Sequence, residues 1–175
     1  MKIILVRHGQ TDWNVNHILQ GKTNIDLNST GKKQALEVKE KLKDIHFDVC
    51  FSSPLKRAYE TASIITDTLI IADDRIIERD LGLLEGKKND LYNAQLYWNY
   101  NLNSNKDNVE SVQEILKRTE QFIDYLKKEY YDKTILIVSH GGTIRALHHV
   151  INGYNENTNF LEIKIPNCCI FEYTI

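Results

Sequence analysis

The stretch that decides the fold is "IILVRHG" at residues 3–9, where an apolar run meets an arginine, a histidine and a glycine. Four consecutive large apolar residues are typical of a strand that is buried on both faces of a sheet. Charged and titratable side chains directly after such a strand must face either solvent or a ligand. The rest of the sequence decides between these two possibilities.

Strand and helix patterns alternate along the chain. Apolar runs predict strands at residues 2–6, 48–52, 69–72 and 133–139. Amphipathic patterns predict helices at residues 30–44, 54–68, 109–130 and 143–151. Two further segments, 161–165 and 169–173, predict a hairpin broken at Pro166 and Asn167. This order predicts an α/β fold, a single three-layer domain over residues 1–175. Its mostly parallel sheet has helices on both faces and allows an antiparallel edge strand at the C-terminal end.

The composition narrows the classes of partner and compartment. The formal net charge of -2 argues against a nucleic-acid partner, because proteins that bind nucleic acid usually carry a basic excess. The spacing of Cys50, Cys168 and Cys169 suits neither a disulfide framework nor a four-ligand zinc site. The apolar runs are too short for a signal-peptide core or a membrane span. We therefore expect a cytoplasmic protein with no membrane partner.

Three predicted strands end in polar residues. These ends are RHG at 7–9, SSP at 52–54 with Arg57 one turn later, and SHGG at 139–142. Ligands of parallel α/β sheets bind beyond the carboxyl ends of the strands, so we expect the three ends to share one site. Two histidines and two arginines make that site electropositive, and glycines such as Gly9 and Gly141 let backbone N–H groups approach an anion. Because arginine forks match phosphate oxygens, a phosphoryl group is the expected occupant.

Each of these features has a competing structural explanation. A single histidine at a strand end is more often structural than catalytic, and Arg57 alone is typical of a solvated surface charge. Two His-Gly pairs at predicted strand ends favour the site over this explanation. His148 and His149 diverge by about 100° on a helix, so we expect packing or surface roles for them rather than a shared metal. "GLLEGKK" at 82–88 lacks the spacing and the final Ser or Thr of a nucleotide-binding P-loop, which excludes a nucleoside triphosphatase.

Four segments in order resemble a known family. They are "LVRHGQTDWN" at 5–14, "SSPLKRAYETA" at 52–62, "ERDLGLLEG" at 78–86 and "VSHGGTIRAL" at 138–147. Together they resemble the four signatures of the histidine phosphatase superfamily, in its phosphoglycerate mutase-like branch. The resemblance covers most of the chain and implies a single α/β domain with a mostly parallel sheet.

The resemblance also implies roles for individual residues. It implies that His8 is phosphorylated during turnover, that Arg7, Arg57 and His140 hold the phosphoryl group, and that Glu78 is the proton donor. Asn14, Gln20 and Gly21 match positions that touch phosphate or substrate in relatives. Since arginines and histidines supply the positive charge, we expect no metal or other cofactor. The expected partner is a small phosphorylated metabolite.

The sequence departs from the glycolytic mutases in ways that favour a phosphatase. Asp80 and Leu81 follow Glu78-Arg79 where the mutases carry His-Tyr, and the chain has no Arg-Arg pair to grip a second anionic group. We therefore expect hydrolysis of a small phosphate monoester. A 2,3-bisphosphoglycerate-dependent phosphoglycerate mutase is the first alternative. A catalytically silent phospholigand-binding or scaffold protein is the second, and the joint presence of His8 and Glu78 argues against it.

The segment from residue 87 to residue 108 is expected to determine the substrate. Its aromatic residues either roof the pocket or pack in the core: Tyr92, Tyr97, Trp98 and Tyr100. Lys87 and Lys88 either reach a second anionic group of the substrate or are solvated. The Asn-rich stretch 99–108 is either a lid over the site or a compositional drift without function.

Overall fold

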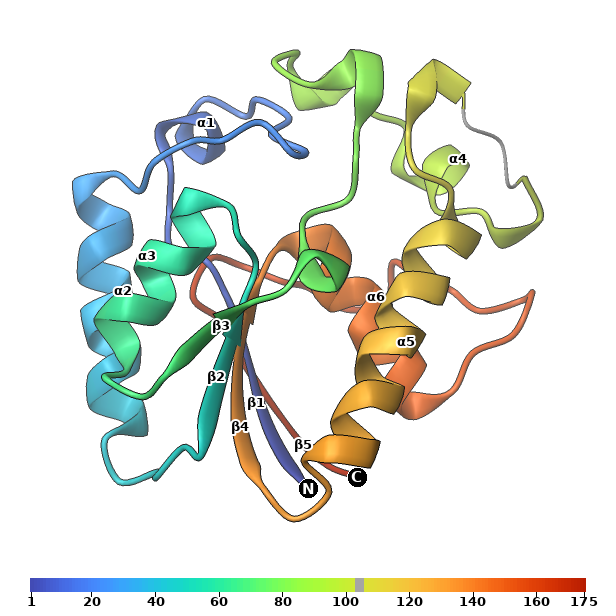
Figure 1. Ribbon diagram of the computed structural model, residues 1–175. Coiled ribbons are helices and arrows are strands. Elements are labelled where there is room, and N and C mark those ends of the chain that lie inside the picture. Colours follow the sequence, from blue (N-terminus) through green and yellow to red (C-terminus); the bar gives the residue numbers. More distant parts are fainter. Residues whose placement is uncertain (103–105) are drawn as a thin grey trace.

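The sheet of the computed structural model, which describes residues 1–102 and 106–175, has the strand order β3-β2-β4-β1-β5 (Figure 1). The strands are β1 (Lys2–Arg7), β2 (Val49–Ser52), β3 (Ile70–Ala72), β4 (Thr134–Ser139) and β5 (Ile170–Thr174). The pairs β1–β4, β4–β2 and β2–β3 are parallel, whereas β5 runs antiparallel to β1. The predicted α/β class, with a mostly parallel sheet and an antiparallel edge, is confirmed.

Helices cover both faces of this sheet. They are α1 (Asp12–Val15), α2 (Ser29–Leu42), α3 (Lys56–Ile65), α4 (Ala94–Tyr97), α5 (Val112–Glu129) and α6 (Gly141–Asn152). Short 3-10 turns span Asp74–Ile76, Gly82–Leu84, Asn89–Leu91, Tyr100–Leu102 and Lys106–Asn108. Figure 1 shows α2 and α3 on one side of the sheet and α5 and α6 on the other. Among the described helices, none has the length and apolar character needed to cross a membrane.

The apolar run at residues 3–6 explains why helices pack on both faces of the sheet. Successive side chains of a strand point to opposite faces of the sheet. Ile3 and Leu5 accordingly belong to the core cluster that includes residues of α5 and α6. Ile4 and Val6 belong to the cluster that includes residues of α2 and α3. All four side chains are fully buried, so β1 contributes to the cores on both faces of the sheet.

Helix α5 starts three residues later than the apolar pattern predicts, because Ser111 caps it. The Ser111 hydroxyl accepts a hydrogen bond from the Glu114 N–H at 3.2 Å, and the Glu114 carboxylate accepts one from the Ser111 N–H at 2.8 Å. Such a reciprocal capping box satisfies two amide groups that would otherwise lack partners, and it fixes the first residue of the helix.

The predicted hairpin of residues 161–165 and 169–173 is wrong. The second segment forms β5, but it pairs with β1, and residues 161–165 form no strand. The backbone carbonyl groups of this region accept hydrogen bonds from arginine side chains instead. Arg145 Nη1 donates to Phe160 O at 2.6 Å and to Ile163 O at 3.2 Å, and Arg7 Nη1 donates to Ile165 O at 2.5 Å. In this region the arginine side chains thus take the place that the N–H groups of a partner strand would have in a ladder.

Candidate active site

His8 follows β1 at the carboxyl edge of the sheet and is only 2% exposed. Its Nδ1 lies 2.7 Å from the Gly9 carbonyl oxygen. A carbonyl can only accept, so Nδ1 carries the hydrogen and Nε2 keeps its lone pair. The His140 ring, at the carboxyl end of β4, lies 5.1 Å from the His8 ring. The structure thus brings together the two histidines that the strand ends predict.

The surroundings of both histidines favour neutral imidazoles. Burial lowers the pKa of His8 well below its usual range, and the positive charges of Arg7 and Arg57 lower it further. The Gly9 carbonyl opposes this shift but does not overcome it. Burial, followed by the charge of Arg57 and the neighbouring His8, likewise lowers the pKa of His140. Both rings are therefore uncharged at neutral pH.

The two arginines each keep a free buried N–H group. Arg57 is fully buried on α3, where Nη1 donates to Thr23 O at 2.8 Å and Nη2 donates to Gly21 O at 2.7 Å. The Nε atoms of Arg57 and Arg7 are buried and have no protein partner. Burial lowers the pKa of Arg57 to about 10, so its guanidinium stays charged at neutral pH. An anion between the two arginines would satisfy donors that nothing else on the described chain satisfies.

Ser53 contacts the ring of the other histidine, His140. His140 Nε2 lies 2.7 Å from Ser53 Oγ, which also accepts a hydrogen bond from the Leu55 N–H at 3.3 Å. A hydroxyl can donate to a ring nitrogen or accept from one, and we assign Ser53 as the donor to His140 Nε2, which places the imidazole hydrogen on Nδ1. His140 Nδ1 is buried and lacks a protein partner. With this assignment His140 offers an N–H, whereas His8 offers a lone pair.

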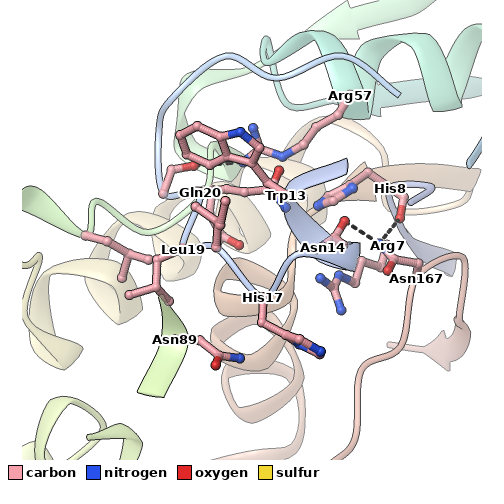
Figure 2. Close-up of a pocket in the computed structure, with 14 residues that line it drawn as sticks. Arg7, His8, Trp13, Asn14, His17, Leu19, Gln20, Arg57, Asn89 and Asn167 are labelled. Atoms are coloured by element: carbon pink, nitrogen blue, oxygen red, sulfur yellow. Dashed lines mark hydrogen bonds between the residues drawn. The ribbon is translucent and has the colours of Figure 1, made fainter. Parts of the chain in front are cut away.

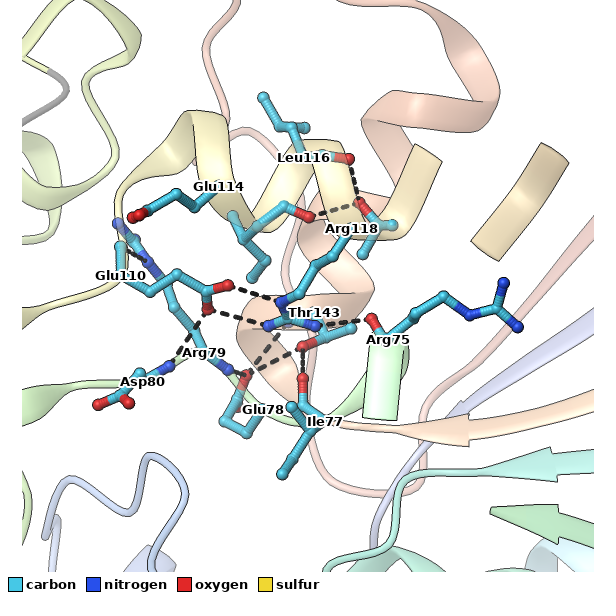
Figure 3. A network of polar contacts seen from close by, with 12 residues as sticks. Arg75, Ile77, Glu78, Arg79, Asp80, Glu110, Glu114, Leu116, Arg118 and Thr143 are labelled. Carbon is cyan, nitrogen blue, oxygen red and sulfur yellow. Dashed lines mark hydrogen bonds and ion pairs between the residues drawn. The ribbon is translucent and has the colours of Figure 1, made fainter. Parts of the chain in front are cut away.

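Glu78 lies between its neighbour Arg79 and the first turn of α6 (Figure 3). Its carboxylate accepts hydrogen bonds from the N–H groups of Arg79 at 2.8 Å, Gly142 at 3.2 Å and Thr143 at 3.2 Å. Unpaired N–H groups at a helix N-terminus are good partners for a carboxylate. The helix thus orients the carboxylate, which lines the same cavity as His8.

A cavity of about 380 Å³ connects these groups (Figure 2). Of the site residues expected from the sequence, seven line it: Arg7, His8, Asn14, Gln20, Gly21, Arg57 and Glu78. His140 and Gly141 are not part of the lining. His140 is fully buried beside His8. Gly141 begins α6 close to Arg7, because a Cβ added at Gly141 would lie 3.7 Å from the Arg7 guanidinium carbon.

The position of Gly9 after a strand predicts that its N–H approaches an anion, but the structure gives this glycine another role. Its N–H donates to Thr61 Oγ1 at 3.0 Å and is not free for an anion. A Cβ at Gly9 would lie 2.4 Å from the Gly31 carbonyl oxygen. The glycine therefore allows the start of α2 to approach β1 closely.

Asn167 is a site residue that the sequence analysis missed, because Pro166-Asn167 carries only a turn signal. Its Nδ2 donates to His8 O at 3.1 Å and to Asn14 Oδ1 at 3.2 Å. Asn14 Oδ1 also accepts from the Thr11 N–H at 3.0 Å. With its oxygen held by these donors, Asn14 turns its amide N–H groups toward other partners.

The outer part of the cavity was also missed. It is lined by Trp13, His17, Ile18, Leu19, Leu81 and Asn89. Among the described residues of the segment 87–108, which was expected to determine the substrate, only Asn89 contributes to this lining.

The aromatic residues of that segment pack against other side chains, and none of the four lines this cavity in the described part of the chain. Tyr92 stacks on Tyr97 at 5.0 Å, and the Arg79 guanidinium lies 4.5 Å from the Trp98 ring. Lys88 donates to Asn16 O at 2.8 Å and does not line the cavity. The proposed lid at 99–108 includes residues 103–105, which lie outside the described residues.

The family model described as histidine phosphatase superfamily (branch 1) matches residues 3–175. The chain belongs to this family. It is 37% identical over 175 residues to a protein named uncharacterized phosphatase PhoE from Bacillus subtilis, with 96% of this chain and 85% of that protein covered. It is 32% identical over 166 residues to phosphoserine phosphatase 1 from Hydrogenobacter thermophilus, with 87% and 77% covered.

A solved structure of the same histidine phosphatase fold supports this assignment. Phosphoserine phosphatase from Entamoeba histolytica, in complex with 3-phosphoglyceric acid, matches with a TM-score of 0.85 and 30% identity, covering 99% of this chain and 90% of that chain. Proteins named phosphoglycerate mutases are also among the relatives. The chain is therefore a histidine phosphatase family enzyme, and the family resemblance of the four sequence segments is confirmed.

Proposed function

We propose that the protein hydrolyses small phosphate monoesters without a metal, through a phosphohistidine formed on Nε2 of His8. One observation carries this proposal. The Gly9 carbonyl holds Nδ1 of His8, while the neighbouring arginines and burial keep the ring neutral. A neutral Nε2 at the edge of an anion-binding cavity is a nucleophile toward phosphorus.

The first step forms the bond from Nε2 to phosphorus and breaks the ester P–O bond. Negative charge on the equatorial oxygens is stabilised by Arg7, Arg57 and the Nδ1–H of His140. Glu78 gives a proton to the departing alcohol oxygen. In the second step Glu78 takes a proton from water, the water oxygen attacks phosphorus, and the bond to Nε2 breaks. Inorganic phosphate leaves, and His8 and Glu78 return to their starting states.

The relatives named as phosphatases support hydrolysis over phosphoryl transfer to another metabolite. Cys50, Cys168 and Cys169 are free thiols, which is consistent with activity in the reducing cytoplasm. The experiment must therefore distinguish hydrolysis from the mutase reaction.

The test is to incubate the protein with p-nitrophenyl phosphate in EDTA, quench rapidly in base, and locate the phosphoryl group by mass spectrometry. We expect continued turnover and a base-stable, acid-labile phosphoryl group on His8. His8→Ala should abolish both, whereas His148→Ala, which changes a histidine outside the cavity, should not. Release of phosphate by His8→Ala at the wild-type rate would refute the mechanism. Interconversion of 3-phosphoglycerate and 2-phosphoglycerate faster than phosphate release would identify a mutase.

A further inference from the structure

We propose that the site selects phosphate esters whose alcohol part is uncharged, over esters that carry a carboxylate or a second phosphate there. This inference rests on the proposed function and names its substrate class. The observation behind it is the chemical character of the outer part of the cavity, where the alcohol part must lie when phosphorus is next to His8.

The outer part of the cavity has an uncharged wall, made of Trp13, Leu19, Leu81 and Asn89, and His17 lies in the same lining. Figure 2 shows Leu19 and Asn89 on the side of the cavity away from Arg7 and His8. The indole and the two leucine side chains offer apolar surface to the alcohol part. The Asn89 amide offers hydrogen bonds without a charge. An alcohol with hydroxyl groups or an apolar ring satisfies such a wall, whereas an anionic group against it loses hydration without gaining an ion pair.

The uncharged wall is held by backbone hydrogen bonds and cannot easily rearrange. Residues 17–19 pair with residues 86–89: the Leu19 N–H donates to Lys87 O at 2.8 Å, and the Gly86 N–H donates to Leu19 O at 2.9 Å. The Asn89 N–H donates to His17 O at 2.8 Å. His17 adopts a left-handed φ of 53°, which turns the chain out of α1 into this pairing. Two segments that are far apart in the sequence thus hold the wall together.

Apart from Lys87, which is exposed and outside the cavity lining, the positive charges near the cavity already have partners. Arg7 and Arg57 face the position of the phosphoryl group, as described above. At the rim, Lys22 pairs with Asp80 at 3.2 Å, and Lys88 is bound to Asn16 O. Arg145 donates to the carbonyl groups of Phe160 and Ile163.

A carboxylate on the alcohol part would lose hydration against the indole and leucine side chains of the wall without gaining an ion pair. We therefore expect discrimination on the order of 10- to 100-fold in kcat/KM against such a carboxylate.

Matched substrate pairs test the inference. sn-Glycerol 3-phosphate and 3-phosphoglycerate differ by a hydroxymethyl group in place of a carboxylate, and phenyl phosphate and 4-carboxyphenyl phosphate differ by one carboxylate on the ring. We expect the uncharged member of each pair to have the higher kcat/KM, by about 10-fold or more. Equal values, or a preference for the carboxylates, would overturn the inference while hydrolysis stands. Absence of hydrolysis with every ester would overturn the proposed function and the inference together.

A charge added to the uncharged wall supplies the second arm. Asn89 is exposed and lines the cavity, so Asn89→Arg should fold and place a guanidinium beside the alcohol part. We expect it to raise the ratio of 3-phosphoglycerate to glycerol 3-phosphate hydrolysis by about 10-fold. Leu83→Arg is the matched control, because Leu83 is 59% exposed and outside the cavity lining. An equal change of the ratio in both variants would mean that overall charge, and not the wall, sets the preference.

Discussion

We assign the hydrogen of the His140 ring to Nδ1 because the Ser53 hydroxyl can donate to Nε2, and Ser53→Ala tests this assignment. In the wild type, Ser53 Oγ accepts from the Leu55 N–H and lies 2.7 Å from His140 Nε2; if it donates to Nε2, the Nδ1–H of His140 is the donor left for a phosphoryl oxygen. Alanine removes the partner of Nε2 without filling new space. The His140 imidazole can then carry its hydrogen on either nitrogen.

The size of the effect follows from the loss of one buried hydrogen bond. His140 is fully buried, so an unsatisfied Nε2 should lower the free energy of unfolding by about 1–3 kcal/mol. If the same interaction energy favours the His140 tautomer with its hydrogen on Nδ1, loss of that tautomer lowers kcat by about 5- to 150-fold. KM should change less than kcat, because the arginines still bind the phosphoryl group.

The assay is steady-state hydrolysis of p-nitrophenyl phosphate, together with urea unfolding. Ser52→Ala is the matched control: Ser52 is a buried serine next in sequence, whose hydroxyl donates to the Ser53 carbonyl at 2.9 Å. It should lose comparable stability without the loss of kcat. A Ser53→Ala variant with reduced stability and wild-type kcat would show that His140 does not depend on Ser53 for its role.

Three further predictions follow from the same geometry. Glu78→Gln should slow single-turnover phosphoryl transfer from alkyl phosphates by about 100-fold or more. It should slow transfer from p-nitrophenyl phosphate much less, because nitrophenolate leaves without a proton. Equal losses of rate with both substrates would exclude Glu78 as the proton donor. Because burial lowers the pKa of His8 and His140, the unfolded chain binds more protons below about pH 6.5. Urea unfolding from pH 8 to 5 should therefore show stability falling as pH falls through that value, by up to about 1.4 kcal/mol per pH unit for each histidine, with a shallower slope in His140→Ala. Gly21→Ala should destabilise more than Gly86→Ala in urea titrations. Both positions have positive φ, but only the Cβ at residue 21 meets another group closely, 1.9 Å from Glu85 Oε1.

The fold was predictable where local pattern and burial agree. The run at 3–6 identifies β1, since only a strand covered on both faces places four consecutive apolar side chains in the core. The segment 161–165 has a similar strand-like pattern, yet its carbonyl groups bind Arg7 and Arg145. Those partners come from β1 and α6, so no local pattern could reveal them.

The inner site was predictable for a topological reason. Parallel strands place their carboxyl ends at one edge, and each of β1, β2 and β4 ends in residues suited to phosphate. The outer wall follows no such rule. It depends on the pairing of residues 17–19 with residues 86–89, which are joined by backbone groups that every residue type has. The contact between Asn167 and His8, which are 159 positions apart, could not be predicted from the sequence for the same reason.

The sequence also could not distinguish the two histidines from one another. His8 and His140 both end a buried strand, and both are followed by glycine. Their chemical difference lies in the atom that holds each ring: a backbone carbonyl on Nδ1 of His8, and a serine hydroxyl on Nε2 of His140. A carbonyl can only accept, so it leaves a lone pair on the far nitrogen; a hydroxyl that donates leaves an N–H there. Two identical side chains, 5.1 Å apart, thereby become the proposed nucleophile and the proposed donor for one phosphoryl group.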